Sequence, residues 1–417
     1  MVGIFEDLGF EAGLAAVLGN LVGVVVLATV FLLLPIFTIW VERKVAARFQ
    51  NRIGPNRVGP YGILQSFPDV VKLLGKELIL PRNVDKIPYL LSPIIMVAAV
   101  VLIVAVIPLA PTIIGTDLSI GALYFVSVGS LTTIAIVMAG WGSNNKYALL
   151  GAFRTVAQLI SYEIPLVFSL LIPILLVGSL SMQTIVEFQD TYWIIFYVPT
   201  AAVIFLVSNI AEIGRAPFDL IEAESELIAG YMIEYSGMAF AMFYLAEFLH
   251  AFLVAVIFSV LFLGGWQGPL AQDVPVLGIA YLTIKSFIVY FAMLWVRMTL
   301  PRFRIDHLMA FNWKFLVPVS IVHVLVTAGI WSALPEPDLS GGWFARLGEE
   351  FPRMALNLVA SVVIAVVSLR LLRQYAEQER QRLSEVTAMV EHKQYPLATT
   401  GQGAQSNVIV VGTGSGD

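Results

Sequence analysis

Nine long runs of apolar residues constrain this chain more than any other feature of its sequence. An α-helix needs about 20 apolar residues to cross roughly 30 Å of hydrocarbon. The runs are continuous and lack the apolar–polar alternation of membrane β-strands. They lie at 14–40, 92–112, 121–141, 158–180, 194–213, 236–263, 276–298, 315–333 and 354–372. The sequence therefore predicts an all-α integral membrane protein with nine transmembrane helices, eight in a core and one C-terminal.

The composition agrees with lipid as the main solvent. Of the 417 residues, 59% are hydrophobic and 13% are charged, whereas soluble proteins carry about 25% charged residues. The chain contains no cysteine. Disulfides, thiol catalysis and Cys-ligated iron–sulfur clusters are therefore excluded within this chain, and an electron carrier of that kind must lie on another one.

The distribution of basic residues predicts the orientation in the membrane. Four inter-run segments and the tail after residue 369 hold 21 Lys and Arg, whereas the intervening segments hold two. The richer segments are 41–91, 142–157, 214–235 and 297–314. Cytoplasmic loops carry such an excess, so we expect the N-terminus outside and the C-terminus inside.

No internal repeat or second folded domain is evident along the chain. Residues 1–373 are predicted to form a single polytopic membrane domain. Residues 374–417 are predicted to form a cytoplasmic tail, first a charged helix and then a disordered stretch, 399–417, rich in Gly, Ser and Thr.

The first inside loop contains a short amphipathic segment after a Gly/Pro-rich turn at 54–62. Gln65, Asp69, Lys72 and Lys76 fall on one helical face, and apolar residues from Ile63 to Leu78 fall on another. A helix of this length and pattern is expected to lie along the membrane surface. Its periodicity alone fits a simple surface anchor equally well.

Four ionisable residues stand out inside the apolar runs, where such a group costs roughly 2.5–3.5 kcal/mol on insertion scales and is usually functional. Glu163 and Glu212 are expected near the inside ends of their runs, where snorkelling to the headgroups is an alternative. Glu247 and Lys285 are deeper, both roughly 16–20 Å from the inside face at about 1.5 Å per residue. A static ion pair between them is a structural alternative to a proton-carrying role.

Two inside loops carry clusters of charge. After the fifth run, Asp219, Glu222, Glu224 and Glu226 fall within eight residues, which favours a charged cavity or cation path over simple decoration of a helix N-terminus. After the seventh run, Arg297, Arg302 and Arg304 are explained by positive-inside topology without a functional role. Of the four histidines, only His250 and His323 lie in runs, and their unequal depths do not suit a bis-histidine haem.

Several motifs resemble those of one known family. The segments 62–77 (GILQSFPDVVKLLGKE) and 217–230 (PFDLIEAESELIAG) resemble the two signatures of subunit 1 of complex I, which in bacteria is the H subunit. Further similar stretches are 41–44, 52–62, 154–163, 245–247 and 295–302. They follow in order from about residue 40 to 318. Ile221 and Phe248 depart from the usual pattern, but no charged motif residue is lost.

The resemblance implies a role in proton-pumping NADH:quinone oxidoreductase. The subunit is expected to form the quinone-binding chamber and the start of the charged path that couples quinone reduction to proton translocation. It implies these residues for the quinone chamber: Arg43, Arg48, Arg52, Asp69, Lys72, Phe218, Arg297 and Arg302. It implies Asp219, Glu222, Glu224 and Glu226 as an acidic loop facing the chamber. The proton-coupling residues are expected to be Glu163, Glu212, Glu247 and Lys285, and no catalytic or metal-binding residue is expected.

The resemblance also implies the molecular surroundings. The chain is expected to bind no cofactor itself, to use quinone as substrate, and to depend on FMN and iron–sulfur clusters of partner subunits. The expected partners are the peripheral-arm subunits and small membrane subunits, in a bacterial plasma membrane. Two alternatives are the related membrane subunit of an energy-converting hydrogenase-type complex and a stand-alone ion transporter. The first would couple redox chemistry to ion flux without quinone, and the second predicts inverted repeats that we do not find.

Overall fold

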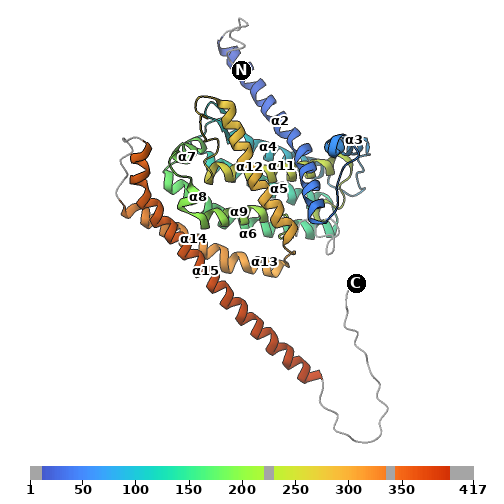
Figure 1. Cartoon of the computed structure of the whole chain (residues 1–417). Helices are drawn as coiled ribbons and strands as arrows, with labels where there is room; N and C mark the ends of the chain where they lie inside the picture. The colour runs from blue at the N-terminus through green and yellow to red at the C-terminus, as the bar shows by residue number, and fades with distance from the viewer. Residues whose placement is uncertain (1–11, 220–229, 335–342, 395–417) are drawn as a thin grey trace, which may run out of the picture. The chain divides into compact units, whose positions relative to one another are not determined.

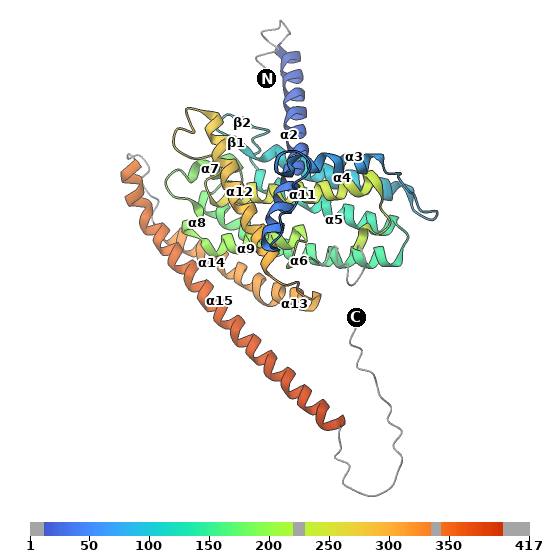
Figure 2. The same ribbon diagram turned by 45° about the vertical axis from the view of Figure 1, so that its right-hand side comes forward.

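A computed structural model describes residues 12–219, 230–334 and 343–394. The chain divides into two compact units, residues 1–365 and residues 366–417. Figures 1 and 2 show the described part of the first unit as a bundle of long helices joined by short connections. Within the described residues, eight helices are long and apolar enough to cross a membrane, as expected for an all-α membrane protein.

The long helices follow one another along the chain with shorter elements between them. The long helices are α2 (Ala12–Phe49), α4 (Lys86–Ile103), α5 (Gly121–Gly142), α6 (Lys146–Val177), α11 (Gly237–Phe262), α12 (Pro275–Thr299), α14 (Val317–Ala333) and α15 (Trp343–Gln394). The shorter helices are α3 (Ser66–Gly75), α7 (Met182–Phe188), α8 (Ile194–Tyr197), α9 (Pro199–Ile213) and α13 (Ile305–Phe311). Single turns lie at η1 (Pro60–Gln65), η2 (Val104–Val106), η3 (Gly230–Met232) and η4 (Asn312–Leu316).

The predicted run at 194–213 forms two helices. α8 ends at Tyr197, and α9 begins at Pro199, where the missing N–H of proline cannot continue the preceding helix. α9 has 15 residues and at 1.5 Å per residue spans only about 22 Å. It is therefore an apolar helix shorter than a typical membrane span.

Several runs differ from the helices at their ends, and two differences bear on the site. The run predicted at 92–112 leaves the α-helix at Ile103; β1 (Pro108–Ala110) lies in its last part and pairs antiparallel with β2 (Ile113–Ile114), which follows the run. α6 begins at Lys146, twelve residues before the predicted 158, because Asn145 caps it by accepting a 2.9 Å hydrogen bond from the Tyr147 N–H.

The early start of α6 gives this helix 32 residues and places Glu163 near its middle. At about 1.5 Å per residue the helix is longer than the hydrocarbon core, so it can extend beyond the membrane.

Helix α11 occupies the centre of the first unit. It packs against α2, α4, α9 and α12, and 83% of its most apolar stretch is buried, compared with 17% for α2. All residues from Leu249 to Phe262 are buried. A helix that is apolar on every side is stable only when neighbours surround it. The single charged residue of this helix, Glu247, is thus held among other helices.

The last helix contacts the core through polar side chains. Tyr197 donates a 3.1 Å hydrogen bond to Glu350, and Thr200 Oγ1 donates one of 2.8 Å to the Ser361 carbonyl. Arg353 donates to the Leu334 carbonyl at 2.9 Å and lies over the Trp331 ring. In the second unit α15 continues to Gln394, so the charged stretch after Arg373 is helical up to that residue. The predicted disorder at 399–417 lies outside the described residues.

Close packing of α5 on α6 predicts the effect of a methyl group at Gly140. A Cβ there would lie 2.3 Å from the Ala152 Cβ, so Gly140→Ala is expected to destabilise the protein by about 1–3 kcal/mol. Gly23→Ala in α2 is the matched control, because nothing lies within 4 Å of its added Cβ. Thermal unfolding in detergent compares the two. Equal midpoints for both variants would contradict this packing.

Candidate functional site

A buried arginine links three helices through ion pairs. Arg215 Nη1 lies 2.6 Å from Glu42 Oε2 on α2, and its Nε lies 3.4 Å from Glu247 Oε1 on α11. Arg297 at the end of α12 pairs with the other oxygen of Glu42. The Tyr290 hydroxyl donates a 3.3 Å hydrogen bond to Glu42 Oε2. Two carboxylates and two guanidinium groups thus form one network, which we call the arginine–glutamate network.

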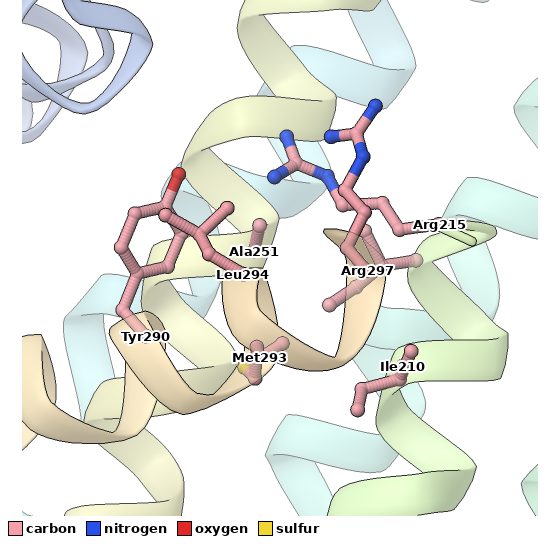
Figure 3. Close-up of a pocket in the computed structure, with 8 residues that line it drawn as sticks. Ile210, Arg215, Ala251, Tyr290, Met293, Leu294 and Arg297 are labelled. Carbon is pink, nitrogen blue, oxygen red and sulfur yellow. The ribbon is translucent and has the colours of Figure 1, made fainter. Parts of the chain in front are cut away.

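The local backbone places Arg215 in this network. Gly214 ends α9 with a φ of 73°, a left-handed conformation that glycine adopts without strain. The chain therefore turns sharply, and the Arg215 side chain points inward, where it is only 6% exposed and lies over the Phe248 ring. Figure 3 shows Arg215 and Arg297 with their guanidinium groups close together, beside Tyr290 of α12.

Gln158 of α6 holds the loop that follows α9. Its Nε2 donates to the Ala211 carbonyl at 2.7 Å and to the Phe218 carbonyl at 2.8 Å. Phe218 is buried between the rings of Tyr162 and Phe303. One amide therefore ties the end of α9, and with it the position of Arg215, to α6.

Glu163 and Glu212 meet on adjacent residues of α5. Ser130 donates a 3.2 Å hydrogen bond to Glu163 Oε1. A Cβ at Gly129 would lie 3.4 Å from Glu212 Oε1. The Glu212 carboxylate therefore lies beside Gly129, the residue that precedes Ser130 on α5. The structure thus brings these two sequence-predicted residues to the same turn of α5.

A small cavity lies between Glu212 and Glu247. Both residues line it together with His250, Thr132 and Tyr231. It provides about 20 Å³ for the centre of a water molecule, above the roughly 10–15 Å³ that one water needs. The cavity thus lies between Glu212, which is near Glu163, and Glu247, which belongs to the arginine–glutamate network.

Lys285 does not join this path. Its Nζ donates to the Gly265 carbonyl at 3.0 Å and the Gln267 carbonyl at 2.8 Å, and lies over the Trp193 ring. The expected alternative of an ion pair with Glu247 is wrong. The lysine extends toward the loop between α11 and α12, whereas Glu247 extends toward Arg215 at the opposite end of α11.

Two ion pairs lie closer to the surface. Arg43 of α2 lies 2.5 Å from Asp69 of α3, and Arg302 lies 2.6 Å from Asp219. The Phe303 N–H also donates to the Pro217 carbonyl at 3.0 Å. These contacts join the loop after α9 to the loop after α12, and α2 to the amphipathic helix.

The remaining expected chamber residues are less constrained. Arg48, Arg52 and Lys72 are exposed, and Arg52 donates a 2.6 Å hydrogen bond to Gln50. Arg297 is drawn inward to Glu42. Glu222, Glu224 and Glu226 of the acidic loop lie outside the described residues. In the ranges that the structure covers, no group of three or more His, Asp or Glu residues is arranged to hold a metal ion.

Sequence reasoning missed Glu42, Arg215, Tyr290 and Gln158 as functional candidates. Glu42 stands within the motif 41–44, and Arg215 directly precedes the 217–230 signature. Both residues fall at the predicted ends of apolar runs, where a charge is ordinary. Only their burial distinguishes them, and burial depends on which helices pack together.

This fold and site define a polytopic membrane protein with a buried chain of acidic and basic groups. The sequence profile described as NADH dehydrogenase matches residues 22–328. The chain belongs to this family.

Curated relatives named as the H subunit of NADH-quinone oxidoreductase are similar over most of their length. The protein from Dehalococcoides mccartyi strain CBDB1 is 49% identical over 302 residues, covering 72% of this chain and 83% of that protein. The one from Geobacillus sp. strain WCH70 is 46% identical, covering 72% and 91%. The one from Brevibacillus brevis is 44% identical, covering 75% and 93%.

The arginine–glutamate network predicts that a double substitution costs less stability than the sum of its two single substitutions. Arg215→Met removes one of the two guanidinium partners of the buried Glu42 and is expected to cost about 3–5 kcal/mol of stability. Adding Glu42→Gln removes the carboxylate charge that has lost this partner, so the double variant is expected to recover part of the loss. Thermal unfolding of the four proteins in detergent measures the coupling. Strictly additive effects would contradict a direct pair.

Proposed function

We propose that this chain is the membrane subunit of a respiratory NADH:quinone oxidoreductase, complex I. In this role it forms the quinone-binding chamber and the first part of the path that couples quinone reduction to proton translocation. The observation that carries the proposal is a series of acidic and basic groups held among the helices: Glu163 and Glu212 beside α5, and Glu247, Arg215, Glu42 and Arg297 in the arginine–glutamate network. The ion pairs Arg302–Asp219 and Arg43–Asp69 lie closer to the surface.

The amphipathic helix α3 supports an entrance for quinone. Phe67, Val71 and Leu74 are 52%, 66% and 61% exposed, an apolar surface suited to an isoprenoid tail arriving from lipid. Asp69 on the same helix binds Arg43. We assign the chamber lining to the residues expected from the sequence: Arg43, Arg48, Arg52, Asp69, Lys72, Phe218, Arg297 and Arg302.

Quinone chemistry suits the charges of this region. Reduction to quinol takes up two electrons and two protons and passes through anionic oxygen, which nearby guanidinium groups stabilise. We infer that these changes alter the protonation of the acidic loop (Asp219, Glu222, Glu224, Glu226), and then of Glu212, Glu163 and Glu247. Lys285 was also expected among the proton-coupling residues; its Nζ binds the Gly265 and Gln267 carbonyls, so we place it outside the series from Glu163 to Glu247.

The electron carriers belong to partner subunits in this proposal. The chain has no cysteine, so the iron–sulfur clusters and FMN of the enzyme reside on peripheral-arm subunits, and quinone binds to this chain as substrate. Small membrane subunits are the expected lateral partners. We infer nine crossings of a bacterial plasma membrane, with α9 as the short one. The N-terminus is then outside and the C-terminus inside.

Glu212→Gln tests the coupling role. It removes a titrating carboxyl but keeps its shape, and general acid–base groups typically contribute about 10²–10⁴-fold to rate. We expect inhibitor-sensitive NADH:quinone reduction and the accompanying proton translocation to fall at least about tenfold in membranes that hold the assembled complex. The exposed Glu187→Gln is the control. Normal activity of Glu212→Gln, or no NADH-linked quinone reduction by the wild type, would contradict the proposal.

Substitutions in the Arg302–Asp219 ion pair distinguish an effect on quinone binding from an effect on protein stability. Both side chains are partly exposed, and such pairs contribute only about 0.2–1 kcal/mol to folding. Arg302→Asp is therefore expected to leave complex assembly intact and to raise the KM for quinone several-fold. The exchange Arg302→Asp with Asp219→Arg is expected to restore part of the KM. An unchanged KM in Arg302→Asp would argue against its place in the chamber.

A further inference from the structure

The small cavity beside Glu247 is lined by more polar side chains than the proposed coupling role uses. Five helices and the turn η3 surround it, and its polar lining consists of Thr132, Glu212, Tyr231, Glu247 and His250. His250 is absent from the residues assigned above, although it follows Glu247 by three positions on α11 and therefore shares its face.

Two polar atoms in the wall of this cavity are enclosed without a hydrogen-bond partner. They are Glu212 Oε2 and His250 Nε2, and the His250 residue as a whole is only 6% exposed. The hydroxyl groups of Thr132 and Tyr231 in the same lining have other neighbours. Thr132 Oγ1 donates to the Gly129 carbonyl at 2.7 Å, and the Tyr231 hydroxyl faces the Met96 sulfur at 3.9 Å.

One ordered water in the cavity would give both enclosed atoms a hydrogen-bond partner. Buried polar atoms without a partner are costly, and ordered waters commonly fill polar cavities where two or more such atoms converge. The cavity has room for one. An empty cavity would leave a carboxyl oxygen and an imidazole nitrogen unsatisfied in the same apolar surroundings, formed by Met96, Ile136 and Leu159.

We propose that a water held between Glu212 and His250 makes the imidazole of His250 a proton relay from Glu212 to Glu247. The inference rests on the proposed function and adds a residue to it. Glu212 and Glu247 belong to different helices, and His250 is, among the described residues that line the cavity between them, the one further side chain with a nitrogen that can take up and release a proton.

The transfer balances without any further reactant. The protonated Glu212 carboxyl gives its O–H proton to the water oxygen while the water gives one of its own protons to the Nε2 lone pair of neutral His250. Glu212 becomes a carboxylate, the water is regenerated, and an imidazolium forms. The imidazolium then returns its Nε2 proton through the same water to the Glu247 carboxylate, which becomes a carboxylic acid.

The surrounding charges favour transfer onward. Glu212 has Glu163 as its neighbour across Gly129 and Ser130 of α5, and proximity of two carboxylates favours a shared proton. Glu247 on the other side is held by Arg215. Arg215 opposes a persistent positive charge on His250, so the imidazolium is short-lived and the proton passes on.

A matched control exists in the same chain. His323 of α14 is 1% exposed, and both of its ring nitrogens lack a partner, but it does not line this cavity. His323→Leu therefore reports the cost of losing a buried histidine without losing the relay.

The experiment uses the assembled complex in sealed membrane vesicles, with NADH and a short-chain quinone as probes. Three quantities are measured: quinone reduction, protons translocated per NADH, and the solvent deuterium isotope effect. We expect His250→Leu and His250→Gln each to lower the proton-translocation rate at least about threefold and to enlarge the isotope effect, since a proton-transfer group is lost. His323→Leu is expected to resemble the wild type in all three.

Two results would overturn the relay. One is a wild-type translocation rate and isotope effect in His250→Leu. The other is full activity in His250→Gln, because an amide holds the water but does not carry a proton. A wild-type complex that does not reduce quinone with NADH contradicts the proposed function, and with it the basis of the relay, whereas the two results above contradict the relay alone.

If the histidine variants fail to assemble into the complex, another variant tests the same cavity. Ile136→Phe fills the cavity from α5 and leaves His250 in place, so it is expected to lower proton translocation in the same way. Infrared difference spectra of the unmodified complex with ¹⁵N-labelled histidine provide a measurement without substitution. An imidazole band that changes during quinone reduction, and persists in His323→Leu, supports the relay, and its absence overturns it.

Discussion

The burial of Arg215 is the constraint on which the rest of the structure depends. A guanidinium that is 6% exposed is tolerated only when carboxylates surround it, because desolvation of an unpaired charge costs several kcal/mol. Glu42 and Glu247 meet this requirement from two different helices. Their positions therefore specify how α2, α11 and the loop after α9 must pack, and Arg297 adds α12 to the same arrangement.

This network lies between two regions of different chemistry. On one side are the surface ion pairs and the exposed apolar face of α3, which suit a lipid-soluble quinone. On the other side are Glu212 and Glu163, which meet on α5 in apolar surroundings. In the proposed function, a change of charge near the surface alters the charge balance of the arginine–glutamate network and, through it, the protonation of Glu212 and Glu163. In the proposed relay, the cavity beside His250 connects Glu212 with Glu247.

Much of the fold could be predicted from the sequence, because apolar length alone defines a membrane helix. Eight of the nine runs contain a helix long enough to cross. The run at 194–213 differs in detail, since Pro199 divides it into α8 and the short apolar helix α9. Charged residues at run ends were also ambiguous: Glu42 and Arg215 look like ordinary boundary charges until packing buries them. Depth alone left a Lys285–Glu247 pair open as an alternative, whereas the direction of each side chain decides its partner.

The central claim is that quinone reduction changes the protonation of the buried carboxyl groups. Infrared difference spectroscopy of the assembled complex, triggered by reduction of bound quinone, measures this directly through the C=O stretch of protonated carboxyls. The account predicts such a band in the wild type, with loss of one component in Glu212→Gln and of another in Glu247→Gln, while Glu187→Gln retains the wild-type spectrum. A quinone-dependent spectrum without carboxyl bands, or one unchanged in both variants, would contradict it.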